Sequence, residues 1–578
     1  MAKRTSIQAE KSTMDAVVQV LEEADVEYVF GVPGGYMMKL YDSLANSSIK
    51  PILTRHEQIA SIMAEVYGRL TGKPGIFTSQ GAWAVSNGLM GAVEAIQGSS
   101  PMVMLTDMTD NAPYSHHGSY QTGTGEYGSY DVKKAVEAAT KYSTVVHMPE
   151  QAVQSVQLAL KHALDGNPGP SAVVFHSSAI NGTVKPDGSP VIYHTKHYLL
   201  DQTQTPHRDE LMKALHTLKE AKNPFIIAGN GVKVSKAFEE LENFAELLGA
   251  PVGTTTMGKS ALRETHPQSV GVIGNWGTPV GNKILSEADV ILVVGSKLAP
   301  TDTCNHHRQL IDPQRQTIIQ IDIESKHASW TLPVDQAIIG DAKRVLYEMI
   351  QLLEHKIEID RNKIEIRIER IAQLKEDSEY IFVDESYADA RPIKPQRALK
   401  EIYDAIDENT MITLDAGENR VYTIRHFKSK VSGSIILPGS AGGMGYAIPS
   451  ALVAKLVYPD KNVLAIAGDG GFSMTMNGLI TAVEHDLPIV TVIFNNSSLG
   501  WVKNAQGEKK VASEFMDIDY GKIGAAMGCL GYTIDDPNDI KGALTEAFHS
   551  NKPAVLDIKT TDEESYHKVM SELATSLE

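Results

Sequence analysis

Short apolar runs alternate along most of the chain with longer segments of helical periodicity. The runs are rich in β-branched residues, as buried strands are, whereas the segments between them repeat their apolar positions every three to four residues. Strands that alternate with helices predict parallel sheets with helices on both faces. The expected fold class is therefore α/β, with three doubly wound parallel-sheet domains. Strands are expected at 28–32, 52–54, 75–79, 102–106, 172–176, 225–228, 290–294, 317–323, 411–414, 462–467 and 488–494, and helices at 13–24, 55–70 and 474–485.

Polar stretches divide this pattern into domains. A proline-containing polar segment that starts near Asn181 predicts a linker, and a charge-rich segment with helical periodicity follows the second group of strands. The charge of that second segment favours a solvated connecting helix, although its isoleucines could cover a neighbouring domain. The predicted divisions are an N-terminal domain at 1–182, a central domain at 205–353, a charged helical linker at 354–392 and a C-terminal domain at 393–578.

The stretch from 462 to 498 carries the most specific chemistry. The strand 462–467 ends in Gly468, Asp469, Gly470 and Gly471, where glycines allow the backbone to approach a phosphate closely. Asn496 follows the next strand, so its amide oxygen should lie at the same sheet edge as the Asp469 carboxylate. Oxygen ligands of this kind suit Mg²⁺, which completes its coordination with phosphate and water. The residues alone predict a magnesium–diphosphate site or a generic nucleotide-binding βαβ unit.

Composition narrows the class of protein. The sequence has 578 residues, a hydrophobic content of 42% and a formal net charge of −18. This acidity argues against a nucleic-acid partner and favours solubility. Two cysteines suit a reducing cytoplasm and exclude a disulfide framework. The N-terminal residues lack an apolar signal core, and no run reaches the ~20 apolar residues of a membrane span, so we expect a cytoplasmic protein without membrane attachment.

The GDG that begins at Gly468, followed at this spacing by the NN that ends at Asn496, resembles the thiamine-diphosphate (ThDP) motif of the acetolactate synthase, pyruvate oxidase and benzoylformate decarboxylase family. The resemblance extends over nearly the whole chain. It implies a pyrimidine-binding, a central and a diphosphate-binding domain, with ThDP and Mg²⁺ as cofactors. It also implies that Asp469, Asn496 and the backbone carbonyl of Ser498 bind the metal.

Glu57 is the predicted acid–base residue. On its own it would be a surface carboxylate in the first turn of a helix, where the helix dipole favours it. However, FGVPGG, RHE and AEVYGRLTGKPG resemble the start of the family's pyrimidine-binding domain. The resemblance implies that Glu57 hydrogen-bonds N1′ of the aminopyrimidine and promotes the tautomer that removes the C2 proton.

Two further C-terminal segments resemble cofactor-binding parts of the family. Gly417, Glu418 and Asn419 stand where the family has Gly-Gln-His near the diphosphate, and because Glu418 departs from that pattern only a backbone role carries over. Met444 stands where a large apolar residue wedges the cofactor into a V shape, and the Gly442 carbonyl should accept a hydrogen bond from its 4′-amine. A methionine in a glycine-rich apolar stretch is otherwise usually a packing residue.

The substrate side departs from the acetolactate synthase pattern. Gln80 falls near the position of an active-site histidine of benzoylformate decarboxylase, and Lys141 matches a lysine of the synthase's Thr-Lys-His. His116 and His117 resemble the paired histidines of pyruvate decarboxylases, or they are two solvated loop histidines. Ala505 replaces the synthase's acceptor-pocket tryptophan, and a Phe-Gln-Glu expected before residue 131 is missing.

The resemblance implies an enzyme that cleaves and forms carbon–carbon bonds of a small 2-oxo acid. A carboligase or lyase of the acetolactate synthase type is the leading hypothesis. The alternatives are a simple 2-oxo acid decarboxylase that releases an aldehyde, and a cofactor-binding relative without turnover. FAD is possible in the central domain, whose strands are followed by glycine-containing loops such as 229–231 and 295–297. The family further implies a homodimer or homotetramer with active sites at the subunit interface.

Overall fold

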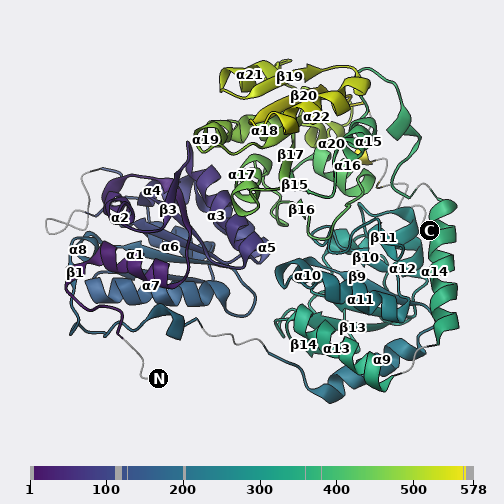
Figure 1. Ribbon diagram of the computed structural model, residues 1–578, viewed down its shortest axis with the longest axis horizontal. Helices are drawn as coiled ribbons and strands as arrows, with labels where there is room; N and C mark the ends of the chain where they lie inside the picture. The colour runs from purple at the N-terminus through teal and green to yellow at the C-terminus, as the bar shows by residue number, and fades with distance from the viewer. Residues whose placement is uncertain are drawn as a thin grey trace. The chain divides into compact units, whose positions relative to one another are not determined.

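The computed structural model describes residues 5–110, 120–126, 128–199, 204–357, 360–378, 380–563, 565–567 and 570. These residues form three six-stranded sheets, and every neighbouring pair of strands within them is parallel (Figure 1). Helices connect most successive strands, although β10 leads to β11 and β13 leads to β14 through irregular loops. The predicted α/β class with three parallel-sheet domains is therefore confirmed.

The N-terminal sheet has the strand order β3-β2-β4-β5-β7-β6. Numbered along the chain within the sheet, this order is 2-1-3-4-6-5. The C-terminal sheet, β16-β15-β17-β18-β20-β19, has the same order. The strands of the N-terminal sheet are β2 (Tyr28–Val32), β3 (Lys50–Leu53), β4 (Gly75–Ser79), β5 (Met102–Asp107), β6 (Tyr142–Val146) and β7 (Pro170–Phe175). The strands of the C-terminal sheet are β15 (Thr410–Leu414), β16 (Ile435–Ile436), β17 (Asn462–Gly468), β18 (Val490–Asn495), β19 (Leu530–Ile534) and β20 (Ala554–Lys559).

The central sheet has the order β11-β10-β9-β12-β13-β14, or 3-2-1-4-5-6, which is the order of dinucleotide-binding domains. Its strands are β9 (Pro224–Ala228), β10 (Val252–Thr254), β11 (Ser269–Val272), β12 (Val290–Val294), β13 (Thr317–Asp322) and β14 (Gln336–Ile339). Alternate residues of β12 enter two different hydrophobic clusters, because successive side chains point to opposite faces. Both faces of the sheet are thus buried at β12, which explains why this strand is apolar throughout.

The helices divide between two compact units. The first unit comprises Met1–Gln202, Pro438–Pro459 and Thr475–Leu487, and the second comprises Thr203–Leu437, Asp460–Met474 and Pro488–Glu578. Helices of the first are α1 (Thr13–Glu23), α2 (Met38–Leu44), α3 (Glu57–Thr71), α4 (Gly81–Ser86), α5 (Leu89–Gly98), α6 (Val132–Ala138), α7 (Pro149–Leu164), α8 (Ser177–Ile180), α17 (Ala447–Val457) and α19 (Gly478–Glu484). Helices of the second are α9 (Arg208–Glu220), α10 (Asn230–Val234), α11 (Phe238–Leu248), α12 (Pro279–Ser286), α13 (Ala342–Lys356), α14 (Arg361–Glu376), α15 (Pro395–Ala405), α16 (Glu418–His426), α18 (Asp469–Thr475), α20 (Gly500–Ala505), α21 (Tyr520–Ala526) and α22 (Ile540–His549).

Two helical predictions need revision. The single helix expected at 474–485 is wrong, because α18 begins at Asp469 and a break at 476–477 separates it from α19. The charged linker contains the end of α13 and the separate helix α14. Arg367 of α14 donates to the carbonyls of Leu248 and Ala221, and the Ile371 side chain is buried. The helix therefore packs on the central domain as well as carrying a solvated face.

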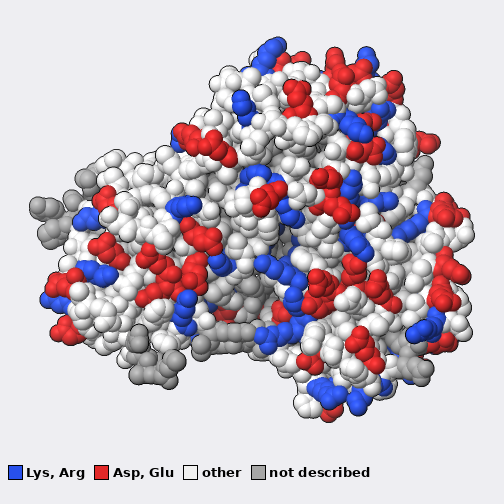
Figure 2. Space-filling view, in the orientation of Figure 1, with Lys and Arg blue, Asp and Glu red and all other residues white. Residues whose placement is uncertain are grey.

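Acidic and basic side chains are interspersed over the face of the molecule in Figure 2. Mixed surface charge of this kind promotes solubility without creating a single-sign field. Within the described part of the chain, no helix combines the length and the apolar character that crossing a membrane requires.

Candidate active site

The strand order of the C-terminal sheet reverses between β15 and β17, which are neighbours. Parallel sheets bind ligands where the order reverses, beyond the carboxyl ends of the strands. Gly417, Glu418 and Asn419 lie after β15, and Gly468, which ends β17, leads into Asp469. The predicted diphosphate residues thus lie at the switch point of their sheet.

Asp469, Asn496 and Ser498 come together at this edge. The Ser498 peptide N–H donates both to Oδ2 of Asp469 at 3.1 Å and to Oδ1 of Asn496 at 3.2 Å, and the Ser498 hydroxyl donates to the same Asn496 oxygen at 3.0 Å. Ser497 has a positive φ of 53°, so the chain turns sharply after β18 and brings Asn496 and Ser498 toward Asp469. The structure therefore brings together all three residues predicted to bind the metal.

The Asp469 carboxylate is suited to a cation. Its side chain is buried, and its hydrogen-bond donors are the peptide N–H groups of Gly470 and Ser498. Burial raises the pKa of Asp469 to about 6, against the opposing effect of these N–H groups. A bound divalent cation would favour the charged form of such a carboxylate.

Asn419 offers an unsatisfied polar atom at the same place. Its side-chain amide donates to the Ala416 carbonyl at 2.8 Å, whereas its Oδ1 is buried and has no hydrogen-bond partner among the described residues. Gly417 has a φ of +102°, a conformation that favours glycine and starts α16 immediately at Glu418. Since buried oxygens are normally hydrogen-bonded, the Asn419 oxygen indicates a missing donor, such as a ligand group or an ordered water.

Glu57 lies in the first turn of α3, within the first compact unit. Its side chain is largely buried, and its two carboxylate oxygens accept from Asn87 Nδ2 at 3.1 Å and from the Ser79 hydroxyl at 3.4 Å. Ser79 ends β4, so Glu57 lies beside the N-terminal sheet's own switch point, between β2 and β4. A carboxylate held by two neutral donors can still exchange a proton with a third partner.

The loop that carries Gly442 and Met444 is anchored in the same unit. Gln58, the neighbour of Glu57, donates to the Met444 carbonyl at 3.2 Å. The buried Glu94 of α5 accepts from the peptide N–H groups of Gly439 and Gly443, the latter at 3.0 Å. The structure thus brings Met444 close to the residue that follows Glu57.

The anchoring residues of this loop were not predicted from the sequence. Glu94 and Glu65 are both fully buried, and the Tyr446 hydroxyl donates to Glu65 at 2.6 Å. Arg69 pairs with the other Glu65 oxygen at 2.6 Å. For Glu65, a charged side chain on the apolar face of the predicted helix that ends at Leu70 was the available signal, because carboxylates are rarely buried unless they are bound to something.

Known proteins similar to this chain identify its family. Three family models match: the N-terminal TPP binding domain of thiamine pyrophosphate enzymes over residues 11–125, their central domain over 211–349 and their C-terminal TPP binding domain over 415–558. A probable acetolactate synthase large subunit of Methanococcus aeolicus is 33% identical over 559 residues, which cover 94% of this chain and 91% of the relative.

The chain belongs to the thiamine-diphosphate-dependent enzyme family. The probable acetolactate synthase large subunit of Methanocaldococcus jannaschii is 32% identical over 94% of this chain and 91% of its own length. The acetolactate synthase large subunit of Haemophilus influenzae is 30% identical over 96% of this chain and 95% of its own length. The protein is an acetolactate synthase-like enzyme that depends on ThDP, as the resemblance of the motifs predicted.

The residues predicted on the substrate side of this ThDP enzyme lie in different places. Gln80 directly follows β4, is mostly buried and donates to Gln121 at 2.8 Å, so it shares the sheet edge of Glu57. Lys141 instead precedes β6, at the opposite edge of the sheet, where its ammonium donates to the carbonyls of Asp165 and Asn167. His116 and His117 lie outside the described residues. The structure therefore brings Gln80, but not Lys141, toward Glu57.

Glu418 departs from the family pattern at the predicted cofactor site. Its carboxylate accepts from Asn504 of α20 at 2.6 Å, and it is mostly buried. Burial raises the pKa of Glu418 to about 7, although the Asn504 hydrogen bond opposes this. With a pKa of about 7, the Glu418 carboxyl is partly protonated at neutral pH, and its protonated form can donate a hydrogen bond as the glutamine of the family pattern would.

Glu418→Gln should stabilise the cofactor-free enzyme more at about pH 8 than at about pH 5. The pKa of Glu418 is raised in the folded protein. The contribution of its carboxyl group to the free energy of unfolding is therefore complete below its ordinary pKa and is lost as the pH rises through about 7. Glutamine removes that loss because it does not ionise. Thermal unfolding at both pH values measures the effect, with the exposed Glu508→Gln as the control. A difference between variant and parent that does not grow with pH would contradict the pKa assignment.

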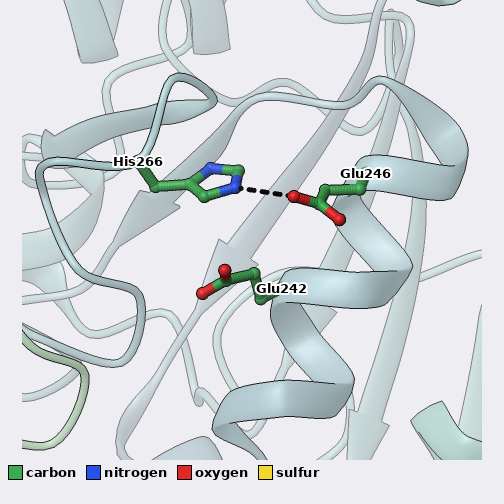
Figure 3. Close-up of side chains that lie close together, drawn as sticks. All are labelled: Glu242, Glu246 and His266. Atoms are coloured by element: carbon green, nitrogen blue, oxygen red, sulfur yellow. Dashed lines mark hydrogen bonds and ion pairs between the residues drawn. The ribbon is translucent and has the colours of Figure 1, made fainter.

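A second group of possible metal ligands lies on the central domain, away from these residues in the sequence. Ligand atoms of Glu242, Glu246 and His266 lie within 4.8 Å of one another (Figure 3). The Gln268 N–H donates to Nδ1 of His266, so the neutral ring carries its proton on Nε2, which faces Glu246 at 3.2 Å. Arg263 already pairs with Glu242 at 2.7 Å. Because a metal would have to displace this proton, we assign the group as a charged surface network.

Proposed function

We propose that this ThDP enzyme catalyses an acetolactate-synthase-type carboligation. Two molecules of a 2-oxo acid such as pyruvate, with one proton, would give one carbon dioxide and one 2-hydroxy-2-methyl-3-oxo acid. The observation that carries the proposal is similarity, over more than nine-tenths of the chain, to proteins named acetolactate synthase large subunits. Cys304 and Cys529 are both free thiols, which supports a reducing cytoplasmic setting as part of the proposal.

A simple 2-oxo acid decarboxylase is the second candidate. Ala505, at the end of α20, stands where the synthase pattern has an acceptor-pocket tryptophan. A site that does not bind the second 2-oxo acid would instead release an aldehyde after protonation. NMR analysis of the products from labelled pyruvate separates the two: acetolactate supports the carboligase, and acetaldehyde as the sole product would replace it with the decarboxylase.

The chain's own residues would hold the cofactor as follows. Asp469, Asn496 and the Ser498 carbonyl would bind Mg²⁺, an arrangement supported by their convergence and by the burial of the carboxylate. Gly417, Asn419 and the glycines 468, 470 and 471 would face the diphosphate, supported by the unsatisfied Asn419 oxygen. When bound, ThDP supplies the electron sink that allows a 2-oxo acid to lose carbon dioxide.

Glu57 would exchange a proton with N1′ of the aminopyrimidine. Its burial and its two neutral donors support this role, because they keep the carboxylate in place without neutralising it by a cation. Met444 would support the cofactor rings, and the Gly442 carbonyl would orient the 4′-amine. Gln58 and Glu94 would act through the backbone of that loop and not on the cofactor itself.

The strand order of the central sheet supports the binding of FAD by this domain. However, the glycine-containing loops at 229–231 and 295–297 are explained by backbone packing alone. The Gly231 N–H donates to the Gly295 carbonyl at 2.9 Å, and a Cβ on Gly231 would lie 2.6 Å from the Cα of Gly295. These glycines allow two backbone segments to pack closely, so we derive no catalytic step through FAD. The absorption and fluorescence spectra of the purified enzyme decide whether flavin is present.

We further propose a homodimer or homotetramer in which each active site combines Glu57 of one subunit with Asp469 of another. Inactive Glu57→Gln and Asp469→Ala chains should then complement each other when they are folded together. About half of randomly paired dimers would be mixed, each with one intact site, so roughly a quarter of parental activity should return. Mixed dimers verified by mass spectrometry that stay inactive would show that each chain builds its own site.

A further inference from the structure

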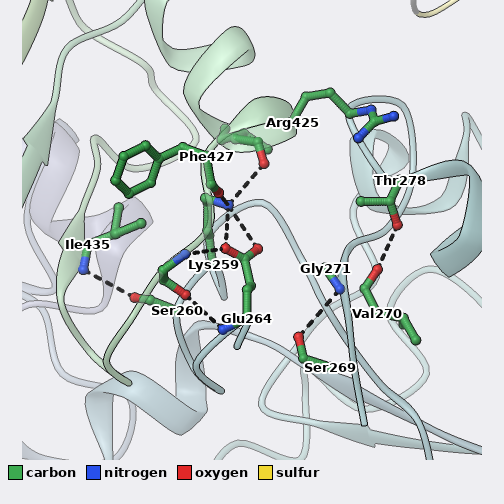
Figure 4. Close-up of polar contacts among 12 residues, drawn as sticks. Lys259, Ser260, Glu264, Ser269, Val270, Gly271, Thr278, Arg425, Phe427 and Ile435 are labelled. Atoms are coloured by element: carbon green, nitrogen blue, oxygen red, sulfur yellow. Dashed lines mark hydrogen bonds and ion pairs between the residues drawn. The ribbon is translucent and has the colours of Figure 1, made fainter. Parts of the chain in front are cut away.

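A buried lysine joins the central domain to the far end of helix α16. The Lys259 side chain is fully buried, and its ammonium donates to the carbonyls of Ile424 at 3.0 Å and of Phe427 at 2.9 Å (Figure 4). Lys259 comes from the loop after β10, whereas Ile424 and Phe427 lie in and just after the last turn of α16. Carbonyls at a helix C-terminus have no partner within the helix, and a cation there also opposes the helix dipole favourably.

Glu264 completes the connection from the same loop. Both of its carboxylate oxygens accept from Lys259, at 2.8 and 2.9 Å, and one also accepts from the Ser429 N–H at 2.8 Å. The Glu264 N–H donates in return to the Ser429 carbonyl at 2.9 Å. The ion pair is therefore satisfied on both sides by backbone groups at the end of α16 and in the segment that follows it.

Stability alone does not explain this pair. Burial lowers the pKa of Lys259 even though Glu264 raises it, which shows that removing the ammonium from water is the larger effect. Apolar residues of similar volume often replace buried ion pairs without loss of stability. What apolar side chains cannot do is bind the two carbonyls and so fix the position of the helix end.

Two residues of α16 itself reinforce the same end. Arg425 donates to the Tyr380 carbonyl at 2.9 Å, and Nδ1 of His426 lies 3.1 Å from the Ile381 carbonyl, so it donates. Burial lowers the pKa of His426 to about 3, so this ring is neutral. The last turn of α16 is thus held by the central domain and by the segment that precedes α15.

The opposite end of α16 is the proposed diphosphate site. The helix begins at Glu418, directly after Gly417, and its second residue is Asn419, whose buried oxygen is unsatisfied. A helix of nine residues moves as a rigid body, so a shift at its C-terminus displaces its N-terminus. A contact at one end can therefore set the geometry at the other.

We propose that Lys259 and Glu264 are positioning residues that hold α16 in place for the cofactor, so that the central domain sets the affinity of the diphosphate site. This inference rests on the proposed assignment of Gly417 and Asn419 to the diphosphate. It gives the central domain a role in cofactor binding that does not depend on a ligand of its own.

The decisive variants are Lys259→Met and the double variant Lys259→Met/Glu264→Gln. The single variant leaves Glu264 charged and buried, so it should lose thermal stability. The double variant removes both charges and keeps an acceptor for Ser429, so its unfolding temperature should recover much of that loss. Calorimetric titration with ThDP in excess Mg²⁺, well below unfolding, should nevertheless show Kd raised roughly two- to thirtyfold in both variants.

The matched control is Arg263→Met, which removes a neighbouring ion pair of the same loop, formed with Glu242 of α11. Its Kd for ThDP should equal that of the parent. A folded double variant with parental Kd would overturn the positioning role and leave the cofactor site intact. If the parent does not bind ThDP with Mg²⁺, both the proposed diphosphate site and the positioning role of Lys259 and Glu264 are overturned.

Hydrogen exchange tests the same coupling without any variant. Because coupling between sites is reciprocal, ThDP with Mg²⁺ should slow amide exchange at 257–264 and 424–435 as well as at 468–471. Residues of β13 and β14, far from α16 along the central sheet, serve as the internal control. Slowed exchange at 468–471 alone would overturn the inference even if both variants fail to fold.

Discussion

Glu57→Gln should slow exchange of the C2 proton of bound ThDP by roughly 10²-fold or more, the usual scale for an acid–base group. Glutamine can keep both contacts, because its oxygen can accept from Asn87 while its amide N–H donates to the Ser79 hydroxyl, which can also accept. It cannot take up and return a proton at N1′. We therefore expect ThDP to remain bound and the unfolding temperature to change little, while proton–deuterium exchange, followed by NMR, falls.

The control for this experiment is Glu484→Gln. Glu484 pairs with Arg55, which lies two residues before Glu57 in the sequence. Among the described residues, the Glu57 carboxylate accepts hydrogen bonds from Ser79 and Asn87 and not from Glu484 or Arg55. Its variant should exchange the C2 proton at the parental rate. An unchanged rate in Glu57→Gln would remove Glu57 from the acid–base role.

Asp469→Ala should weaken Mg²⁺-dependent ThDP binding by about tenfold to a hundredfold, the range expected for one lost charged ligand. The loss should be specific to the metal, because the Asp469 carboxylate is the one charged group among the three predicted ligands. Asp517→Ala removes an exposed carboxylate paired with Lys559 and should bind as the parent does. Calorimetric titration with and without Mg²⁺ measures both. Equal affinity in Asp469→Ala and parent would refute the metal assignment.

The edge of the C-terminal sheet could be predicted because local patterns encode it. The strand predicted at 462–467 is β17 with one residue added, and the predicted 488–494 largely overlaps β18. Buried parallel strands must be apolar on both faces, so their ends are visible as the first glycine or polar residue. Asp469, Asn496 and Ser498 follow such ends directly, and the structure places them in contact.

The helix after β17 could not be placed in the same way. Glycine costs about 1 kcal/mol in a helix interior, so Gly470 and Gly471 predict a loop rather than a helical turn. In the fold, α18 nevertheless starts at Asp469, whose carboxylate accepts from the Gly470 N–H at 2.8 Å. Tertiary context thus outweighs the local propensity, and the helix expected from 474 to 485 becomes two.

The anchoring residues depend on contacts between distant parts of the sequence. Glu94 binds the backbone near Gly443, and Lys259 binds carbonyls beyond residue 420. Neither partner forms a local motif, so a single sequence shows only that a charged residue stands in an apolar segment. Pairings of this kind are decided by the packing of the whole domain.

The measurement that most directly tests the account is carbon dioxide release from carboxyl-labelled pyruvate and related 2-oxo acids. The parent should release label only with both ThDP and Mg²⁺ present, and Glu57→Gln should release it roughly 10²-fold more slowly at saturating cofactor. Release that needs no ThDP, or no release from any 2-oxo acid by a parent that binds ThDP, would contradict the proposed reaction.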